Sequence, residues 1–405
     1  MIWLPESLRS TKGVPSVATI GIDATALSSP SPGGIGTSLY ETIRAMAALE
    51  APHAFILYAA KPPLVPFTHE PLDTGWPVRL GTGLTTRSNI LWMQTGVNRL
   101  LEHDGVEVFW SPRHLLPFRA RGIAKVATIQ DFWDRLYPEQ QPLANRVATR
   151  VLTDRVARDA DVVVTLSEAT ARDVERFCAT PRERIRVIPA GVDASVFSPA
   201  SGAVVDAVLQ RFCVRRPYVL IMDAYNPRKN AVAVLDAVGR LAAGGTSVDV
   251  VALGRPRATA REVDLATLAT AHGVSGSLRI PGDVTRDDLV ALMSGALAFV
   301  YPSVYEGFGM PVLEAMACGC PVITSNVSSL PEVADDAALL VTPTDAAEIA
   351  AALSRLLTDA EERCRLAEAG VARAREFTWR RTAGGMLAAF EEALAIARAR
   401  RGGIR

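Results

Sequence analysis

Short apolar runs alternate with helix-length segments along nearly the whole chain. The runs are rich in Val, Ile, Leu and Phe, as expected for strands that are buried on both faces of a sheet. This alternation predicts an α/β protein with parallel sheets and flanking helices. The strands predicted for the first half of the chain are 17–22, 53–58, 106–110, 125–129, 161–165 and 186–188.

The periodicity stops in the segment 189–199, which we interpret as a connection between two domains. A second series of predicted strands follows, at 218–222, 248–253, 278–280, 296–300 and 322–323. Thr378 is a candidate N-cap for a last helix that runs to about residue 400. We therefore expect two doubly wound, Rossmann-like domains, residues 1–197 and 198–376, that face each other across a ligand-binding cleft.

Composition excludes several classes of protein. The 405 residues include 43 Lys plus Arg and 43 Asp plus Glu, and this balance argues against a nucleic-acid binder. Five cysteines without zinc-ligand spacing indicate reduced thiols in a cytoplasmic protein. No apolar run approaches the ~18 residues of a membrane span. The first ten residues lack the order of a signal peptide, and residues before 17 are expected to form a loose extension.

Two glutamates, Glu306 and Glu314, enclose seven residues that combine a glycine turn with the start of a helix. Gly307 and Gly309 permit positive φ angles and close approach to a ligand. Pro311 suits the first position of a helix, which would end at Gly319. The apolar runs on either side make this a β-loop-α-β unit, so the motif lies at the carboxyl end of a parallel strand, where ligands bind in such sheets.

The chemistry of this segment fits a nucleotide sugar. The helix N-terminus presents free N–H groups to phosphate, and carboxylates accept hydrogen bonds from the vicinal hydroxyls of sugar and ribose. The alternative is a pair of solvated glutamates beside an ordinary βα loop. The position between two buried strands favours the nucleotide-sugar site.

The segment 301–323 resembles the signature of retaining, GT-B-fold glycosyltransferases of family 4, and the resemblance extends through 331–333 and 338–341. It implies metal-independent transfer of a sugar, without a cofactor, from a nucleotide diphosphate sugar, with GDP-mannose favoured. The acceptor would be a glycan or polyprenyl-linked glycan in cell-surface polysaccharide synthesis. The resemblance also implies that the last helix, 377–405, packs back on the first domain. It makes no prediction about the oligomeric state.

The resemblance assigns roles to residues of the second half. Glu314 would hold the ribose, and Glu306 would hold the sugar. The cations Arg228 and Lys229 would stabilise the leaving diphosphate. The remaining donor-binding positions are backbone groups near the sugar and the base, at Gly307, Phe308, Gly309, Met310 and Val284.

In the first half, Gly33 and Gly34 lie in a glycine-rich loop that similar enzymes place against the donor phosphate and the acceptor. A structural turn is the alternative. We expect the following helix to begin near Thr37 or Ser38, because Ser38 and Glu41 have the spacing of a capping box.

The chain departs from the family pattern at two places. Where relatives often have His-Asp, it has Gln130-Asp131, so an imidazole is absent there, and Asp131 remains to orient the acceptor or to act as base. His114 is a possible substitute, and Trp133 is a second acceptor-side candidate. Where relatives often have Gly-Arg, the chain has Asp223-Ala224, which removes a cation near the diphosphate.

These departures leave two alternatives open: a nucleotide-sugar-binding protein without transferase activity, and a sugar-phosphate synthase of the same fold with a soluble acceptor. The segment 89–94 contains Trp92 and Met93, which would either face a lipid-linked acceptor or pack in the core. We expect a cytoplasmic protein, with peripheral contact at the inner face of the membrane as an option.

Overall fold

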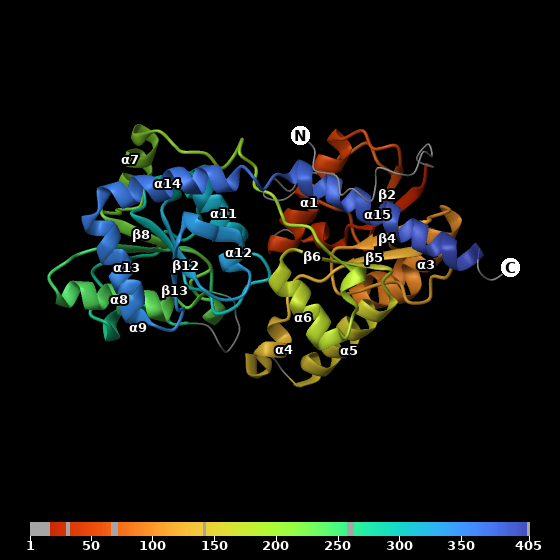
Figure 1. The fold of residues 1–405 in the computed structure, drawn as a ribbon, viewed down its shortest axis with the longest axis horizontal. Helices are drawn as coiled ribbons and strands as arrows, with labels where there is room; N and C mark the ends of the chain where they lie inside the picture. The colour runs from red at the N-terminus through yellow and green to blue at the C-terminus, as the bar shows by residue number, and fades with distance from the viewer. Residues whose placement is uncertain (1–16, 30–32, 66–71, 141–142, 257–262, 403–405) are drawn as a thin grey trace. The chain divides into compact units, whose positions relative to one another are not determined.

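The computed structural model describes residues 17–29, 33–65, 72–140, 143–256 and 263–402, so the expected loose extension before residue 17 lies outside the described residues. Two parallel sheets with flanking helices make up the fold (Figure 1). The chain divides into two compact units. One comprises the residues through Thr128, Asp159–Val163 and Met386 onward, and the other comprises Ile129–Arg158 and Val164–Gly385. The predicted boundary at 197–198 stays a prediction.

The first sheet has seven strands in the order β3-β2-β1-β4-β5-β6-β7. In chain order they are β1 (Thr19–Asp23), β2 (Ala54–Ala59), β3 (Val78–Leu80), β4 (Val108–Ser111), β5 (Ala124–Thr128), β6 (Val162–Thr165) and β7 (Ile185–Val187). β1 pairs in parallel with both β2 and β4. The strand order reverses between β1 and β4, as in doubly wound folds.

The second sheet has six strands in the order β10-β9-β8-β11-β12-β13. They are β8 (Tyr218–Ile221), β9 (Asp249–Ala252), β10 (Leu278–Arg279), β11 (Ala298–Tyr301), β12 (Val322–Ser325) and β13 (Leu339–Val341). β8 pairs in parallel with β9 and β11. Its order reverses between β8 and β11, so this sheet is doubly wound as well.

The α-helices are α1 (Gly33–Ala48), α2 (Asn89–Leu91), α3 (Val97–His103), α4 (Trp133–Leu136), α5 (Leu143–Asp159), α6 (Glu168–Cys178), α7 (Gly202–Arg211), α8 (Ala231–Ala243), α9 (Leu265–Ala271), α10 (Arg286–Ser294), α11 (Met310–Ala317), α12 (Leu330–Ala334), α13 (Ala346–Thr358), α14 (Ala360–Ala374) and α15 (Trp379–Gly402). Short 3₁₀ turns are Thr25–Ser28, Gly83–Arg87, Pro138–Gln140, Arg182–Arg184, Pro227–Lys229 and Asp335–Ala337, and Trp92–Gly96 is a π-helix.

The predicted α/β class and all eleven predicted strands are confirmed, because each predicted range overlaps an observed strand. Two observed strands, β3 and β13, were not predicted. Each has three residues and lies at the edge of its sheet; in β3 an arginine interrupts the apolar run, whereas β13 is apolar throughout and only its shortness distinguishes it from the predicted strands of the core. The segment 189–199 contains neither helix nor strand, as expected for a connection.

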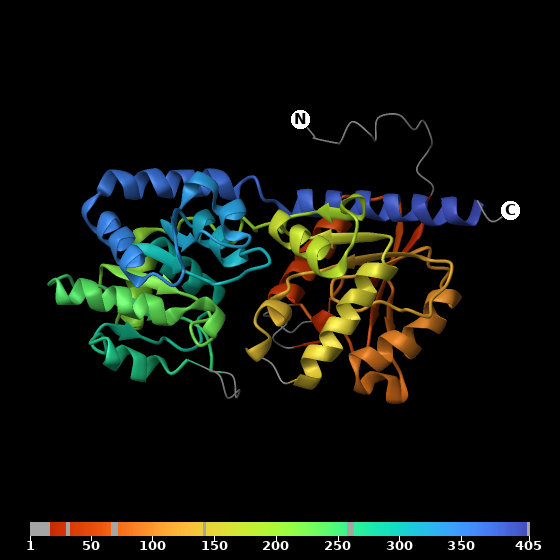
Figure 2. The same cartoon turned by 60° about the horizontal axis from the view of Figure 1, so that its bottom comes forward.

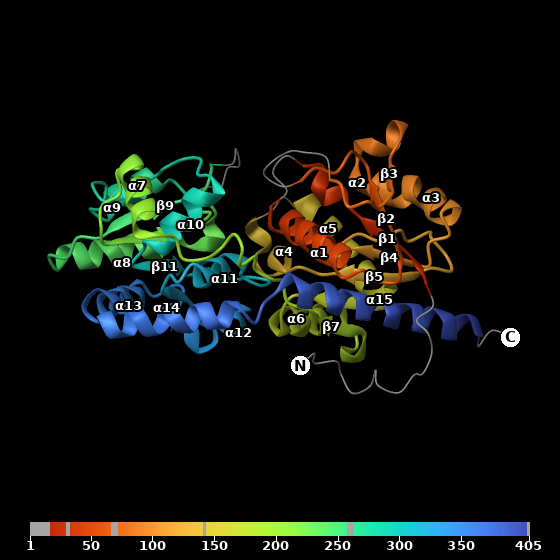
Figure 3. The same ribbon diagram turned by 90° about the horizontal axis from the view of Figure 1, so that it is seen from above.

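Apolar faces of α8 and α13 cover one face of the second sheet. Val234 and Val238 of α8 are fully or almost fully buried in one cluster with Val219 of β8 and Leu353 of α13. The two helices lie side by side in Figures 1 and 3. The loops that follow β8 and β11, at the carboxyl ends of these strands, carry the predicted site.

The last helix begins as predicted, because the hydroxyl oxygen of Thr378 accepts a hydrogen bond from the Arg381 N–H (3.2 Å). From Met386 on, the helix belongs to the first unit (Figure 2). Phe390 contacts the Trp110 ring, with centroids 5.8 Å apart. Arg398 pairs with Glu107 (3.2 Å), and Arg400 pairs with Asp161.

The helix expected near Thr37 or Ser38 begins earlier, at Gly33, so that prediction is wrong. Gly33 has a φ of +62°, which glycine tolerates at no steric cost. Ser38 is consequently inside the helix, where its carbonyl accepts a bond from Thr42 (2.7 Å), and Glu41 pairs with Arg44 (2.8 Å).

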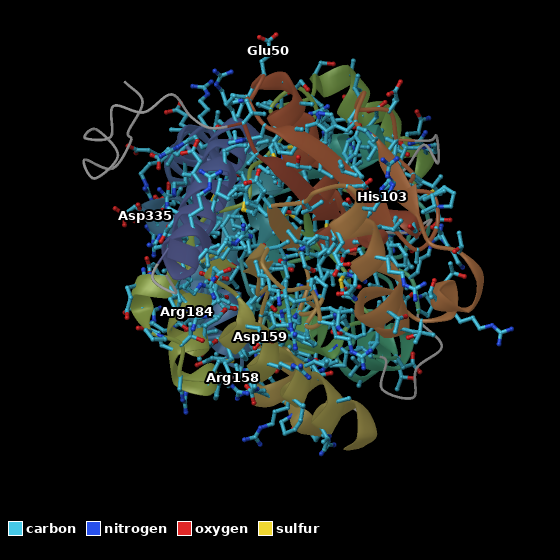
Figure 4. The ribbon with its side chains drawn as sticks, turned by 90° about the vertical axis from the view of Figure 1, so that its right-hand side faces the viewer. Glu50, His103, Arg158, Asp159, Arg184 and Asp335 are labelled. Atoms are coloured by element: carbon cyan, nitrogen blue, oxygen red, sulfur yellow. The ribbon has the colours of Figure 1, made fainter. Side chains whose placement is uncertain are left out.

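The segment 89–94 was expected either to face a lipid-linked acceptor or to pack in the core. Trp92 and Met93 are buried, so this pair packs in the core. At the end of α5, the Arg184 guanidinium donates to the carbonyl oxygens of Ala157 (3.1 Å) and Arg158 (3.0 Å; Figure 4). Within the described part of the chain, no helix combines the length and apolar character needed to cross a membrane.

Candidate nucleotide-sugar site

The two chain segments of the predicted site begin where β8 and β11 end. These strands are neighbours, with Val219 opposite Ala298 in a parallel pairing, and the strand order reverses between them. Because parallel strands end at the same edge, the loop after β8 brings Arg228 and Lys229 beside Glu306 from the loop after β11. This is the position at which open α/β sheets bind ligands.

A short 3₁₀ turn positions the two cations. The Asn226 side chain accepts a hydrogen bond from the Arg228 N–H (3.1 Å), and Asn230 ends the turn with a φ of +57°. The Arg228 carbonyl oxygen in turn accepts from the Val304 N–H (3.0 Å) and lies 3.0 Å from the Ser303 hydroxyl oxygen. The cation-bearing turn is therefore fixed to the loop that carries Glu306.

Glu306 is buried, with 5% of its surface exposed, and one oxygen of its carboxylate accepts three hydrogen bonds. Oε1 accepts from Lys229 Nζ (2.5 Å), from Ser303 Oγ (2.6 Å) and from Tyr301 Oη (3.1 Å). A buried charge is tolerated only when it is paired and hydrogen-bonded. These contacts meet that requirement and hold the side chain in one orientation.

Arg228 joins two carboxylates. One guanidinium nitrogen lies 3.4 Å from Glu306 Oε2, and another donates to Asp131 Oδ2 at 3.0 Å. The guanidinium also lies over the ring of Trp133, 5.5 Å from its centroid, a favourable cation–π geometry. The predicted residues Asp131 and Trp133 are thus part of one cluster with Arg228, Lys229 and Glu306.

The electrostatics of the cluster favour an ionised Glu306. Burial alone would raise the pKa of this carboxyl, but the nearby Lys229 and Arg228 outweigh burial and hold it below its ordinary value. Burial lowers the pKa of Lys229, against the opposing attraction of Glu306. The pKa of Arg228 is raised, because Glu306 and Asp131 outweigh the effect of its burial. Two cations and two carboxylates therefore share one compact, neutral cluster.

Because Gly307 has no side chain, the segment 130–131 packs closely against the glycine turn that follows Glu306. A Cβ atom at position 307 would lie 1.9 Å from the Gln130 carbonyl oxygen and 3.0 Å from Asp131 Cβ. No side chain fits there, so glycine is required by the packing at this point. The structure therefore places Gln130 and Asp131 beside the turn that was predicted to hold the sugar.

The helix α11 begins one residue earlier than predicted, at Met310, and Pro311 remains within its first turn. Gly309 caps it with a φ of +112°, a conformation that glycine adopts readily. Glu314 lies about one turn inside and keeps part of its surface exposed. Burial raises the pKa of its carboxyl to about 7, and Arg286 offsets part of that rise.

The other predicted donor-binding residues would contact a ligand mainly through their backbone groups. Phe308 is buried, and its ring packs edge-on against Phe377 (5.9 Å between centroids), so only its backbone is available to a ligand. Val284 follows a turn in which Gly282 has a φ of +77° and Asp283 pairs with Arg255. The predicted role of the Val284 backbone at a nucleobase stays a prediction.

The structure gives a physical account of the Asp223-Ala224 departure. Asp223 adopts a φ of +52°, a left-handed conformation that favours glycine and that aspartate tolerates better than most residues. Its carboxylate accepts a bond from the Asn226 side chain (2.9 Å). Ala224 is fully buried in the core of the second unit, so a long cationic side chain would not fit there without rearrangement.

Gly33, Gly34 and His114 lie in the first unit. The two glycines are exposed and form the first turn of α1. His114 follows Arg113, which lies 3.6 Å from the buried carboxylate of Asp23. Their predicted roles toward the donor and the acceptor stay predictions.

Sequence reasoning missed Tyr301 and Ser303, which donate to the Glu306 carboxylate. The available signal was a pair of polar side chains at the end of a buried strand, within five residues of a glutamate. It also missed that Asp131 and Arg228 pair with each other. Among the residues that the structure describes, no three or more His, Cys, Asp or Glu side chains are grouped as metal ligands.

Comparisons with known proteins identify the family of this chain. The profile of "Glycosyl transferases group 1" matches residues 211–373, and that of "Glycosyltransferase Family 4" matches residues 32–196. The chain is 34% identical over 274 residues to O-antigen chain mannosyltransferase B of Escherichia coli, covering 67% of this chain and 71% of that protein.

It is also 34% identical over 246 residues to MMP alpha-(1->4)-mannosyltransferase of Mycolicibacterium hassiacum, where the match covers 60% of this chain and 56% of the relative. The chain thus spans little more than half of that relative's length. Sucrose-phosphate synthase from Thermosynechococcus elongatus has the same fold, with a TM-score of 0.77 at 18% identity, and covers 94% of this chain and 100% of its own. These matches, together with the two doubly wound sheets, show that the chain belongs to glycosyltransferase family 4 and has the GT-B fold.

Proposed function

We propose that this protein transfers a sugar, with retention of configuration, from a nucleotide diphosphate sugar to a glycan or polyprenyl-linked glycan. The observation that carries the proposal is the buried cluster in which Arg228 and Lys229 share the Glu306 carboxylate. The partly open Glu314 follows in the same motif, about one turn inside α11. Preorganised cations of this kind stabilise charge that develops on a leaving group.

The proposed donor is GDP-mannose. Two relatives, from Escherichia coli and Mycolicibacterium hassiacum, are named as mannosyltransferases, and this supports the sugar. The guanine base follows from the resemblance of the 301–323 segment. The Escherichia coli relative is named for the O-antigen chain, which supports an acceptor in cell-surface polysaccharide synthesis. The proposal places the reaction in the cytoplasm, at the inner face of the membrane where the acceptor is lipid-linked.

The proposed roles follow from the charges and donors of each residue. Glu314 accepts hydrogen bonds from the ribose hydroxyls, and Glu306 accepts from a hydroxyl of the sugar. Arg228 and Lys229 bind the diphosphate, Arg228 as a planar donor and Lys229 as a point charge. The N-terminal N–H groups of α11 add to the positive field at this place.

The proposed chemical step needs no protein base. The bond between the anomeric carbon and the diphosphate oxygen breaks, and the acceptor oxygen bonds to that carbon on the same face. The acceptor proton passes to the leaving phosphate oxygen. Asp131, held by Arg228, is positioned to orient the acceptor, and Gln130 supplies hydrogen bonds without titrating.

A thermal-shift panel tests this function. The wild type and Glu314→Ala are melted with GDP-, UDP-, ADP- and dTDP-sugars in metal-free buffer. A ligand at ~100 times its dissociation constant stabilises by about 2.7 kcal/mol. We expect one base class to raise the wild-type midpoint and Glu314→Ala to lose that rise. Glu348→Ala is the control, because Glu348 is likewise a partly exposed glutamate in a helix, α13.

An assay of sugar transfer and of slow donor hydrolysis completes the test. Binding with neither reaction would favour a nucleotide-sugar-binding protein, the reading motivated by Gln130 and Asp223. No midpoint shift with any nucleotide sugar would contradict the donor site.

A further inference from the structure

The helix α6 makes an unusual set of contacts with the loops around Glu306. The residues involved are Ser167, which is the N-cap of α6, Thr170 in its first turn, and Glu332 of α12. We call these three residues the α6 contact. All three belong to the same compact unit as Glu306. The 331–333 segment was part of the family resemblance, but the proposed function gives Glu332 no role.

The hydroxyls of the α6 contact hold one backbone carbonyl. Ser167 Oγ donates to the Gly307 carbonyl oxygen at 2.7 Å, and Thr170 Oγ1 donates to the same oxygen at 3.2 Å. Both side chains are almost completely buried. Ser167 also caps α6 by accepting the Thr170 N–H (3.1 Å), so its position is set by the helix itself.

Glu332 fixes the same helix end from the other side. Its carboxylate oxygens accept the N–H groups of Glu168 (2.7 Å) and Ala169 (2.6 Å), which have no partner inside the helix. A carboxylate at a helix N-terminus is also favoured by the helix dipole. Glu332 therefore orients the first turn of α6 and, through it, the hydroxyls that bind Gly307.

The carbonyls on both sides of Gly307 are held in a similar way. Ser329 Oγ lies 3.0 Å from the Glu306 carbonyl oxygen and 2.8 Å from that of Phe308, and can donate to either. By contrast, no residue in the described ranges accepts a hydrogen bond from the Phe308 N–H. A trans peptide is planar, with its C=O and N–H pointing in opposite directions. Fixing the Gly307 carbonyl therefore aims the Phe308 N–H away from α6.

We propose that Ser167, Thr170 and Glu332 are positioning residues for the donor sugar: they hold the Gly307–Phe308 peptide so that its N–H faces the sugar of the bound donor. This inference rests on the proposed function, because it requires a nucleotide sugar at Glu306. It predicts an effect on the sugar part of the donor that leaves the nucleotide part unchanged.

The test compares two ligands, GDP-mannose and GDP, by calorimetry on the full chain; if the panel above selects another base, the corresponding pair is used. We expect Thr170→Val to weaken GDP-mannose binding about threefold and the double variant Ser167→Ala, Thr170→Val about tenfold. GDP binding should change less than about twofold. Glu332→Gln should behave like Thr170→Val, because it keeps one acceptor and loses the charge.

Two control variants remove comparable bonds elsewhere. Thr42→Val removes a buried hydroxyl-to-carbonyl bond of 2.7 Å within α1, and Glu348→Gln alters a carboxylate-to-amide bond of 2.8 Å in α13. Both should leave the two affinities unchanged. Thr170→Val keeps the N-cap of α6, so it provides the test even if Ser167→Ala unfolds the helix.

Equal losses of GDP-mannose and GDP affinity would overturn the inference, because the α6 contact would then only stabilise the fold. Unchanged affinities in all three variants would overturn it as well. A wild type that binds GDP but no nucleotide sugar contradicts the proposed function itself, and this outcome is distinguishable because it needs no variant.

Discussion

The surroundings of Glu306 and of Glu314 differ sharply, although seven residues separate them in one motif. Glu306 is buried among three polar donors and a second cation, and its pKa lies below the ordinary value because Lys229 and Arg228 outweigh burial. Glu314 lies on α11 without an ion-pair partner of this kind, and burial raises its pKa to about 7. The two pKa values therefore shift in opposite directions, and the difference comes from the two cations after β8.

Because of this difference, the two carboxyls are suited to different roles in ligand binding. Glu306 is ionised and immobile before any ligand arrives, which suits a group that fixes a sugar and two phosphate-binding cations. The Glu314 carboxyl keeps part of its surface exposed and titrates near neutral pH, which suits a group that binds hydroxyls only when a nucleotide is present. Substitutions at the two glutamates and at the charged residues beside them test this difference.

Glu306→Gln should destabilise the protein strongly, by about 3 kcal/mol, because it leaves Lys229 and Arg228 buried with one carboxylate between them. The free energy of unfolding is measured in urea at pH 7.5 for the variant and the wild type. The matched variant Glu314→Gln should show no such loss. A stability of Glu306→Gln within about 0.5 kcal/mol of the wild type would mean that the cluster is not a coupled unit.

Glu314→Gln should raise the free energy of unfolding at neutral and alkaline pH and leave it unchanged at acidic pH. With a folded pKa near 7 and an unfolded value of ~4.3, the native wild type holds its proton more tightly, so its stability falls as pH rises from about 4.5 to 7. Glu314→Gln has no ionisable group at this position, so its stability does not fall over this pH range. We expect a gain of about 2 kcal/mol at pH 8, allowing for the exposed part of the carboxyl, and none near pH 4.

The same titration should appear in binding. The ionised form of Glu314 accepts two hydrogen bonds, so wild-type affinity for GDP should increase as pH rises from 6 to 8, and Glu314→Gln should bind weakly without this trend. Calorimetry across this range measures both slopes. Parallel pH profiles for the two proteins would contradict a role for Glu314 at the ribose.

Arg228→Lys should weaken binding of GDP by about tenfold. Lysine keeps the charge but loses the planar donor set that spans Asp131 and Glu306 and lies over Trp133. Equilibrium binding at low and high salt provides the measurement. Arg355→Lys is the control, since Arg355 forms a more exposed pair with Glu362 (2.6 Å). Equal affinity for Arg228→Lys and the wild type would show that charge alone is sufficient.

How much of this site could be predicted depends on how local each signal is. The strands before Arg228 and Glu306 were predicted because buried apolar runs are local, and the glycine turn and α11 follow from Gly309 and Pro311 nearby in sequence. The pairing of Asp131 with Arg228 joins residues 97 positions apart, and only the folded chain shows it. The same holds for Gly307, whose lack of a side chain is required by the distant Gln130 carbonyl.

The misplaced start of α1 has a different cause. The spacing of Ser38 and Glu41 imitates a capping box, but a helix can begin earlier when glycine relieves the strain of its first residue, as at Gly33. Capping patterns report a possible start and do not exclude another one upstream. The edge strands β3 and β13 escaped prediction because each has only three residues, too few to show a period.

Asp223→Asn should have the smallest effect and should test how the second departure from the family pattern acts on the cations. Asparagine tolerates the left-handed conformation at position 223, and its side-chain oxygen can still accept from Asn226, so stability should change by less than about 0.5 kcal/mol. Removing the carboxylate charge near Lys229 should tighten GDP binding about two- to threefold at low salt, and the gain should vanish at high salt through screening. Asp236→Asn on α8, where Arg240 pairs with the carboxylate (3.1 Å), is the control for a general change of charge. Equal gains in both variants would assign the effect to net charge. A gain confined to Asp223→Asn would show that the chain carries a carboxylate which weakens its own diphosphate site, and that Arg228 and Lys229 bind the diphosphate against it.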